Sequence, residues 1–275
     1  MPAPPAGVRV YQITHSGYEL DHDAVRLGIP AAPLAPCMPW TPHGGAGPSP
    51  TELAVPTHTQ LCIADEATFW PWFTWPDIAN WPAKDRTLVI VPVAGFADHG
   101  LDAPLDSEET VLMSLLKRAS ETRPTDLSLL ILPPLRYVLG PQPDCAFAVE
   151  PDVGCNLLEE VGGSVAFAGF SRMVFVNASP WNEELCKAVS RDLRIHRRLQ
   201  VFGINLSALG LDFHPVRGGQ RGALRSVLAS LGGPENPPGE KILKDTAARL
   251  LSLFAEMRDR PALAAGGEIP LQSWP

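Results

Sequence analysis

The chain has 275 residues, of which 45% are hydrophobic, and its formal net charge is −8. This length can bury the core of one large α/β domain or of two small ones. The acidic balance argues against nucleic acid or an anionic membrane surface as a partner, and no apolar run is long enough to span a bilayer. The N-terminus lacks the charged start and apolar stretch of a signal peptide, and the five cysteines form no CxxC pair. We therefore expect reduced thiols in a cytoplasmic protein.

Residues 1–70 are rich in Pro, Gly and small side chains, which predicts an irregular extension that packs on the rest of the chain. Four tryptophans lie close together between Phe69 and Pro82, a density typical of core packing or of a wall on which a ligand stacks. We expect residues 71–265 to form the main domain and residues 266–275 to form a loose tail. The extension also contains histidines that could supply ligands if it folds over a site: His15, His22, His43 and His58.

Regular structure is predicted from residue 72 onward. The run DRTLVIVPVAG at residues 85–95 is continuously apolar after its charged start, as in a central strand that is covered on both faces. Strands that alternate with helices along the rest of the chain predict a three-layer α/β/α fold with a largely parallel central sheet. The expected elements are helices at 108–121, 156–170, 180–199 and 240–260, and strands at 127–135, 172–179 and 199–209.

Two polar segments follow predicted strands, at the ends where parallel sheets bind ligands. In the first, FADHGLD, His99 is a candidate metal ligand or general base, or a histidine bonded only to backbone. Asp98 could supply a carboxylate, although neighbouring residues of an extended chain point opposite ways. Glu108 could ligate a metal, or it could only stabilise the first turn of a helix capped by Asp106 or Ser107.

The second polar segment is NASPWN, residues 177–182. Ser179 and Pro180 make a well-formed helix start, because Ser is preferred at the N-cap and Pro at the first helical position. Alternatively, Ser179 is a nucleophile that His99 activates. Further along, Arg217 belongs to a basic cluster that could hold a carboxylate or phosphate, or that forms only a solvated loop and helix face.

From about Phe73 to Arg260 the chain resembles the creatininase family of amidohydrolases. FTWPDIANWPAKDRTLVIVPVAG is similar to the opening of that family, and ILPPLRYV resembles its LPPLPYG strand. ADHGLDAPLDSEE lies where the family has EQHGPHLPLGTD, and GFSRMVFVNASPWNEE lies where it has a strand ending in NGHGGN or NGHYEN. The resemblance implies a creatininase-like fold, a homohexameric assembly, two divalent metals such as Zn or Mn, and hydrolysis of non-peptide C–N bonds.

The resemblance places family metal ligands on His99 and Glu108, but the other ligand positions fall on Ala97, Ser179 and Trp181. A methyl, a hydroxyl and an indole cannot replace a carboxylate and two further donors. We therefore predict that the two-metal centre is largely lost, with at most one divalent metal at His99 and Glu108, or none. The predicted catalytic residues are His99, Asp98 and Ser179, and the predicted ligand-binding residues are Asn182, Trp181 and Arg217.

Two functions follow from these residues, and the sequence leaves open whether the protein is an enzyme. The first is a creatininase-like protein that acts on or binds a small amide, lactam or formamide at the C-terminal strand ends. The second is a catalytically inert pseudoenzyme that serves as a scaffold or partner subunit. In both cases we expect a homo-oligomer with no nucleic-acid or membrane partner.

Overall fold

The computed structural model describes residues 65–261, apart from 102, 141, 143, 218–220 and 233–236, together with two short strands nearer the N-terminus. These strands, β1 (Ile13–Thr14) and β2 (Gly17–Tyr18), pair antiparallel. The chain divides into two compact units, residues 1–57 and 58–275. The predicted boundaries at residues 70/71 and 265/266 stay predictions, and the four histidines of the predicted extension lie outside the described residues.

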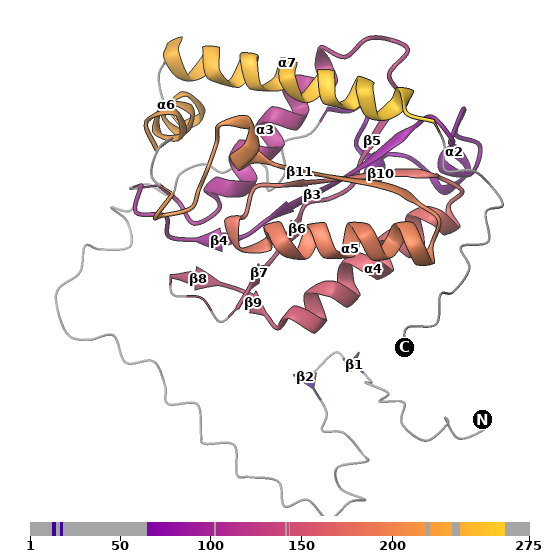
Figure 1. Cartoon of the computed structure of the whole chain (residues 1–275), viewed down its shortest axis with the longest axis horizontal. Helices are drawn as coiled ribbons and strands as arrows, with labels where there is room; N and C mark the ends of the chain where they lie inside the picture. Colours follow the sequence, from indigo (N-terminus) through magenta and orange to yellow (C-terminus); the bar gives the residue numbers. More distant parts are fainter. Residues whose placement is uncertain are drawn as a thin grey trace, which may run out of the picture. The chain divides into compact units, whose positions relative to one another are not determined.

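A parallel sheet forms the centre of the second unit (Figure 1). Strand β3 (Leu88–Ala94) pairs with β10 (Arg172–Asn177) on one side and with β5 (Leu129–Ile131) and β6 (Leu135–Arg136) on the other. Strand β11 (Gln200–Asn205) pairs with β10 and completes the order β11-β10-β3-β5. Every pairing in this sheet is parallel, which confirms the predicted largely parallel sheet.

Helices cover both faces of the sheet (Figure 1). One face packs against α3 (Ser107–Glu121), α6 (Arg221–Gly232) and α7 (Pro237–Asp259). The other face packs against α2 (Trp75–Ala79), α4 (Pro151–Phe167) and α5 (Glu183–His196). The three-layer α/β/α architecture predicted from the sequence is therefore confirmed.

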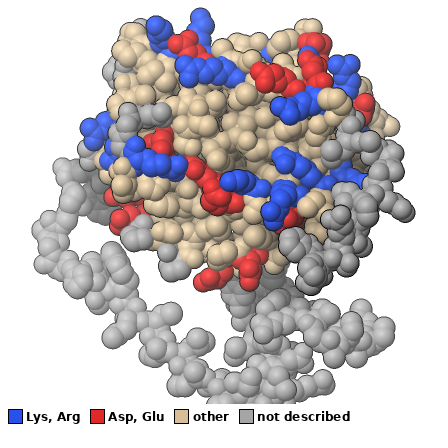
Figure 2. Space-filling model, in the orientation of Figure 1, with Lys and Arg blue, Asp and Glu red and all other residues tan. Residues whose placement is uncertain are grey.

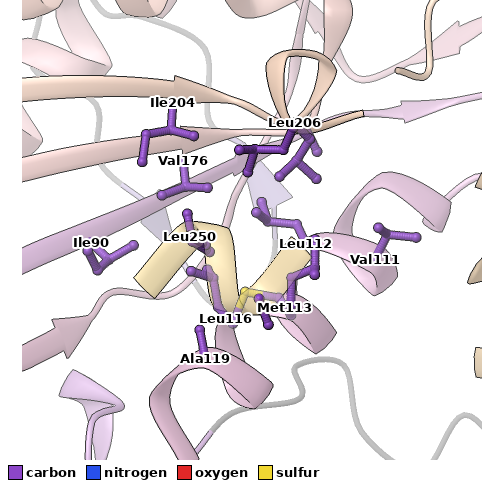
Figure 3. Packing of buried hydrophobic residues seen from close by; sticks show 14 of the residues in the cluster. Ile90, Val111, Leu112, Met113, Leu116, Ala119, Val176, Ile204, Leu206 and Leu250 are labelled. Atoms are coloured by element: carbon purple, nitrogen blue, oxygen red, sulfur yellow. The ribbon is translucent and has the colours of Figure 1, made fainter. Parts of the chain in front are cut away.

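The alternating side chains of β3 divide the apolar interior into two cores. Leu88 and Ile90 join the core beneath α3 and α7, whereas Val89 and Val91 join the core beneath α4 and α5. All four side chains are fully buried, as expected for a central strand covered on both faces. Figure 3 shows the first core, which contains Ile90, Val176 and Ile204 from the sheet, Leu112 and Leu116 from α3, and Leu250 from α7.

Several element boundaries differ from the predictions. Helix α4 begins at Pro151 rather than at residue 156, because Pro at the first helical position needs no backbone N–H. Helix α6 was not predicted, and the last strand ends at Asn205, where a 3₁₀ helix, η3 (Leu206–Leu209), begins. Segments interpreted as loops contain the short strands β4 (Phe96–Ala97), β8 (Cys145–Ala146) and β9 (Ala148–Val149), and β7 (Val138–Leu139) was not predicted as a separate strand.

The surface carries charges of both signs. On the face shown in Figure 2, Lys and Arg lie intermixed with Asp and Glu, with uncharged surface between them. Among the described residues, no helix combines the length and apolar character needed to cross a membrane.

Candidate functional site

Glu108 lies in the first turn of α3 and faces the C-terminal end of β3. Its Oε2 accepts a hydrogen bond from the backbone N–H of Gly95 at 2.5 Å, and its Oε1 lies 2.9 Å from His99 Nε2. The Glu108 side chain is fully buried and that of His99 is 3% exposed. Asp106 is the N-cap residue of α3, but its side chain forms no cap hydrogen bond. Both predictions for Glu108 therefore hold at once: it lies in the first turn of a helix, and its carboxylate lies at the C-terminal end of β3.

The contact between His99 and Glu108 is close but lacks the direction of a hydrogen bond. Both atoms, His99 Nε2 and Glu108 Oε1, are consequently buried without a hydrogen-bond partner. The rest of His99 is well held, since its carbonyl accepts from Arg221 Nη2 at 2.8 Å and its ring packs on Phe213 at 4.9 Å. Buried polar atoms are almost always paired in proteins, so this pair marks a place where a ligand can bond.

Ser179 lies beside this pair, at the end of β10. Its backbone N–H donates to Asn177 Oδ1 at 3.1 Å, and its carbonyl accepts from Asn177 Nδ2 at 2.7 Å. Ser179 is the N-cap residue of the 3₁₀ helix η2 (Pro180–Asn182) and Pro180 is its first residue, as predicted, but the Ser179 hydroxyl makes no cap hydrogen bond. Asn177 already satisfies the backbone of this turn, so the buried Ser179 Oγ has no partner.

Gly95 separates Ser179 from Glu108. A Cβ built on Gly95 would lie 3.2 Å from Glu108 Oε2 and 3.4 Å from Ser179 Oγ. The Glu108 carboxylate and the Ser179 hydroxyl therefore lie on either side of the position that a Gly95 side chain would take, and Val138 Cγ2 already fills that position. The structure brings together three of the predicted site residues here: His99, Glu108 and Ser179.

The structure does not bring Asp98 into this cluster. Ala97 and His99 are buried while Asp98 between them is exposed, as expected for successive residues of an extended chain. The Asp98 carboxylate instead accepts a hydrogen bond from the N–H of Gly100 at 2.7 Å. Its catalytic role stays a prediction that this geometry does not favour.

Trp181 and Asn182 lie in η2, next to Ser179. The Trp181 ring packs on His214 with the ring centroids 5.2 Å apart, and its buried Nε1 has no well-directed hydrogen-bond partner. Asn182 is fully buried, and its amide bonds to backbone on both sides: Oδ1 accepts from Leu139 N at 3.0 Å and Nδ2 donates to Tyr137 O at 2.8 Å. Trp181 can therefore still donate to a ligand, whereas Asn182 fixes the backbone near the site.

Arg217 is held by acidic side chains. Its guanidinium donates two hydrogen bonds to Glu183, both at 3.0 Å, and its Nε lies 3.3 Å from Asp212 Oδ2. These interactions raise the pKa of Arg217, and the hydrogen bonds to Glu183 contribute most to the increase. A ligand carboxylate would have to compete with both acids, and the predicted ligand-binding role of Arg217 stays a prediction.

Sequence reasoning missed one residue of this neighbourhood, Cys145. Strands β4 and β8 pair antiparallel with Ala97 directly opposite Cys145, and opposite residues project to the same face. Burial raises the pKa of the Cys145 thiol, the charges of Glu108 and Asp144 raise it further, and a contact with the Trp181 indole partly offsets these effects. A two-residue strand has no detectable periodicity, so no sequence signal pointed to this pairing.

The side chains present do not fit a pair of divalent metals. Within the described ranges, no group of three or more His, Cys, Asp or Glu residues could hold a metal ion. His99 and Glu108 supply two donors, fewer than the three protein ligands usual in a catalytic zinc site. The neighbouring ligand position is the methyl of Ala97, which cannot coordinate.

Comparison with known proteins identifies the family. The sequence model of Creatininase, described as creatinine amidohydrolase, matches residues 72–230, which is more than half of the chain. No curated protein matches. Solved creatininase structures share the fold. A creatininase mutant with a tryptophan replaced by alanine aligns with a TM-score of 0.57 at 14% identity, over 70% of this chain and 100% of that chain. A mutant creatininase of Zn-Zn type (TM-score 0.55, 15% identity, 71% of this chain and 100% of that chain) and a mutant creatininase complexed with creatine (TM-score 0.54, 14% identity, 70% of this chain and 100% of that chain) align similarly. The match to the family model, on a fold shared with solved creatininases, shows that this chain belongs to the creatininase family.

Proposed function

We propose that this protein binds a small amide, lactam or formamide at the C-terminal ends of β3 and β10 and acts on its C–N bond without paired metals. The observation that carries the proposal is a set of three buried side-chain atoms without a hydrogen-bond partner near the C-terminal ends of β3 and β10: His99 Nε2, Glu108 Oε1 and Ser179 Oγ. A related solved structure is a creatininase complexed with creatine, a small nitrogen-rich molecule. Donors and acceptors that are buried but unpaired are costly in a folded protein, and a bound ligand would satisfy them.

The mixture of donors and acceptors in this cluster suits an amide group. Glu108 Oε1 can accept a hydrogen bond from an amide N–H, while the Ser179 hydroxyl and the Trp181 indole N–H can donate to a carbonyl oxygen. A bond to the charged carboxylate would be stronger than a neutral one, and the buried setting strengthens it further. The site would thus recognise both ends of the C–N bond at once.

Glu108 and His99 supply the groups for proton transfer. Glu108 is fixed by the Gly95 N–H at one oxygen, which leaves the other oxygen directed at His99. A carboxylate and an imidazole in contact can take a proton from an attacking group and return it to a leaving nitrogen. The fixed orientation of both side chains would favour such a transfer because little reorganisation is needed.

The proposal is tested by ligand binding to chelator-treated protein. We expect isothermal titration calorimetry to detect binding of 2-pyrrolidinone, formamide or creatinine. Loss of the charged acceptor in Glu108→Gln should weaken binding about ten-fold, and loss of one hydrogen bond in Ser179→Ala about five-fold. Asp106→Asn is the matched control, since this side chain is near α3's start but makes no cap bond. Two equivalents of tightly bound Zn or Mn per purified chain would refute the metal-free site, and absence of binding would refute the ligand class.

A second candidate function is an inert scaffold or partner subunit. It is favoured by Asn182 and Arg217, because the polar groups of both side chains already bond to other groups of this chain. It predicts no turnover of any amide, with or without added metal. The homo-oligomeric state implied by the resemblance and the cytoplasmic location remain proposals. Light scattering would test the first, with a mass that is a multiple of 29.6 kDa supporting self-association and a monomer mass excluding it.

A further inference from the structure

A cavity of about 540 Å³ lies at the N-terminal ends of β3 and β5, at the opposite end of the sheet from the proposed amide site. This volume is within the range of cavities that hold small organic ligands. None of its described lining residues belongs to the amide site. The wall comes from the turn before β3 (residues 81–83), the last turn of α3 (Ser120 and Glu121), the connection that follows (Arg123 and Thr125) and the start of β5.

Trp81 lines this cavity and is held in a fixed orientation. Its Nε1 donates to Ser128 Oγ at 3.3 Å, and its ring meets that of Phe73 edge-on with the centroids 5.0 Å apart. Ser128 Oγ lies 2.9 Å from Thr87 Oγ1, whose hydroxyl donates to the carbonyl of Ala83 at 3.0 Å. Because the indole N–H already has an acceptor, Trp81 can offer a ligand its ring surface.

Arg123 lines the same cavity, and only part of its guanidinium is engaged. Its Nη1 donates to Asp65 Oδ2 at 3.1 Å and to the carbonyl of Ser120. Within the described part of the chain, Nε and Nη2 of Arg123 have no hydrogen-bond partner, and the side chain is 24% exposed. Asp65 and Ser120 therefore hold the guanidinium in place and leave the edge formed by Nε and Nη2 to a ligand.

Arg136 shows what this edge of a guanidinium binds in the same protein. Its Nε and Nη2 donate to the two carboxylate oxygens of Glu109, at 2.5 and 2.8 Å. Paired bonds of this kind are the geometry by which arginine recognises a carboxylate. The equivalent edge of Arg123 therefore suits a carboxylate that a ligand supplies.

The rest of the lining favours an apolar ligand body. Pro82 and Leu129 contribute apolar side chains beside Trp81. Glu121 also lines the cavity, but its side chain is 51% exposed and its carboxylate lies 3.9 Å from the Lys117 ammonium. Solvent and this ammonium therefore weaken the repulsion between Glu121 and a bound anion.

We propose that this cavity is a second binding site, which takes a small carboxylate with an aromatic body. The carboxylate bonds to Nε and Nη2 of Arg123, and the ring lies on Trp81. The site is separate from the proposed amide site and recognises its ligand by charge and stacking. Trp81 also packs on the core beneath α4 and α5, so both interpretations of the tryptophan-rich segment apply to it.

The test is titration of the intact chain with 2-naphthoate, measured by isothermal titration calorimetry. We expect one equivalent to bind with a Kd at or below about 1 mM, an affinity ordinary for a ligand of this size. Two probes separate the contributions. 2-Naphthalenemethanol keeps the rings without the charge, and acetate keeps the charge without the rings. Each should bind at least about ten-fold more weakly than 2-naphthoate.

Variants locate the bound anion. Arg123→Lys keeps a positive charge beside Asp65 but loses the paired N–H donors, so it should weaken 2-naphthoate binding at least about ten-fold. Arg225→Lys is the matched control, because Arg225 is exposed on α6 outside the cavity, and its binding should be unchanged. Thr125→Trp places a large side chain at an exposed lining position, where it should block binding while circular dichroism shows an intact fold.

NMR of the indole N–H groups distinguishes the two sites. The signal of Trp81, assigned by its loss in Trp81→Phe, should shift when 2-naphthoate binds, whereas that of Trp181 should not. Absence of binding, or undiminished binding in Arg123→Lys and Thr125→Trp, overturns the proposal. A shifted Trp181 signal together with loss of binding in Glu108→Gln also overturns it, because the anion then occupies the amide site. Binding of 2-pyrrolidinone is measured separately, so either proposal can fail without the other.

Discussion

At the scale of single residues, the site depends on the absence of a side chain at Gly95. Glu108, Ser179 and Val138 can all approach this position only because residue 95 has no Cβ. Gly95 also donates its N–H to Glu108, which fixes the carboxylate. A glycine is required here for close approach of neighbouring groups and not for a left-handed backbone, since its φ is not positive.

Gly95→Ala should therefore destabilise the protein. The new methyl would overlap Val138 Cγ2, and Val138 is fully buried, so it cannot move away without displacing its neighbours. Overpacking of this kind costs about 1–3 kcal/mol in the free energy of unfolding, which urea denaturation measures. Gly222→Ala is the control, because a Cβ there meets nothing within 4 Å in a helix. The control should be neutral or stabilising by up to about 1 kcal/mol, and equal effects at the two positions would contradict the argument.

Ser179 is both the N-cap residue of η2 and a buried residue whose hydroxyl has no hydrogen-bond partner. It is the residue type preferred before a helix, and it does precede Pro180 at the start of η2. The sequence could not show that Asn177 would take over the bonds to this turn and leave the hydroxyl unpaired. Similarly, the pairing of Arg217 with Glu183 joins residues far apart in the chain, and no local pattern records it.

At the scale of elements, Asn182 ties η2 to β7 and to the residue before it. The side chain accepts from Leu139 N and donates to Tyr137 O, so a helical turn and a short strand share one buried amide. These bonds hold the segment that carries Val138 against Gly95. The position of Val138 beside Gly95 thus depends on Asn182, which contacts neither residue through these bonds.

Asn182→Ala should cost about 2–4 kcal/mol in the free energy of unfolding, because two buried backbone groups lose their partners. Asn182→Asp keeps the acceptor for Leu139 N but loses the donor to Tyr137 O. Hydrogen exchange should then show the Leu139 amide still protected in Asn182→Asp and unprotected in Asn182→Ala. Asn80→Ala is the control, since this exposed side chain bonds only to Pro76 O and its loss should change stability by less than about 0.5 kcal/mol. Similar protection of Leu139 in both Asn182 variants would argue against the bridge.

The long elements were predictable and the short ones were not. β3 and β10 are apolar through most of their length and are buried on both faces, which leaves a clear signal in the sequence. β4 and β8 have two residues each, and only their pairing across a loop defines them. The resemblance to a known family predicted His99 and Glu108 as neighbours, but it could not predict Cys145, because the family motifs have no counterpart in that loop.

At the scale of the whole molecule, the two apolar cores contribute most to stability. Phe254 of α7 is among the largest fully buried side chains and packs in the core formed with α3. Phe167, at the end of α4, is 87% exposed and belongs to neither core. The same residue type thus occurs in opposite environments within one fold.

Phe254→Ala should lower the free energy of unfolding by about 3–5 kcal/mol, because a buried ring is lost and a cavity remains. Phe167→Ala should change it by less than about 0.5 kcal/mol, since the exposed ring has little to lose. Thermal unfolding followed by circular dichroism measures both. A comparable loss for the two variants would show that the surface around Phe167 is buried in solution, as in an oligomer.

The strand order has a consequence for how the chain is made. Leu88 of β3 pairs with Leu129 on one side and with Arg172 on the other, and Arg172 pairs in turn with Gln200. No two of these strands are joined by a hairpin, so each contact closes a long loop, which makes folding slow. During synthesis, β3 can pair with β5 well before β10 leaves the ribosome. The edge of β3 that later pairs with β10 stays uncovered in the interval. The nascent protein therefore presents an aggregation-prone edge that the finished sheet hides.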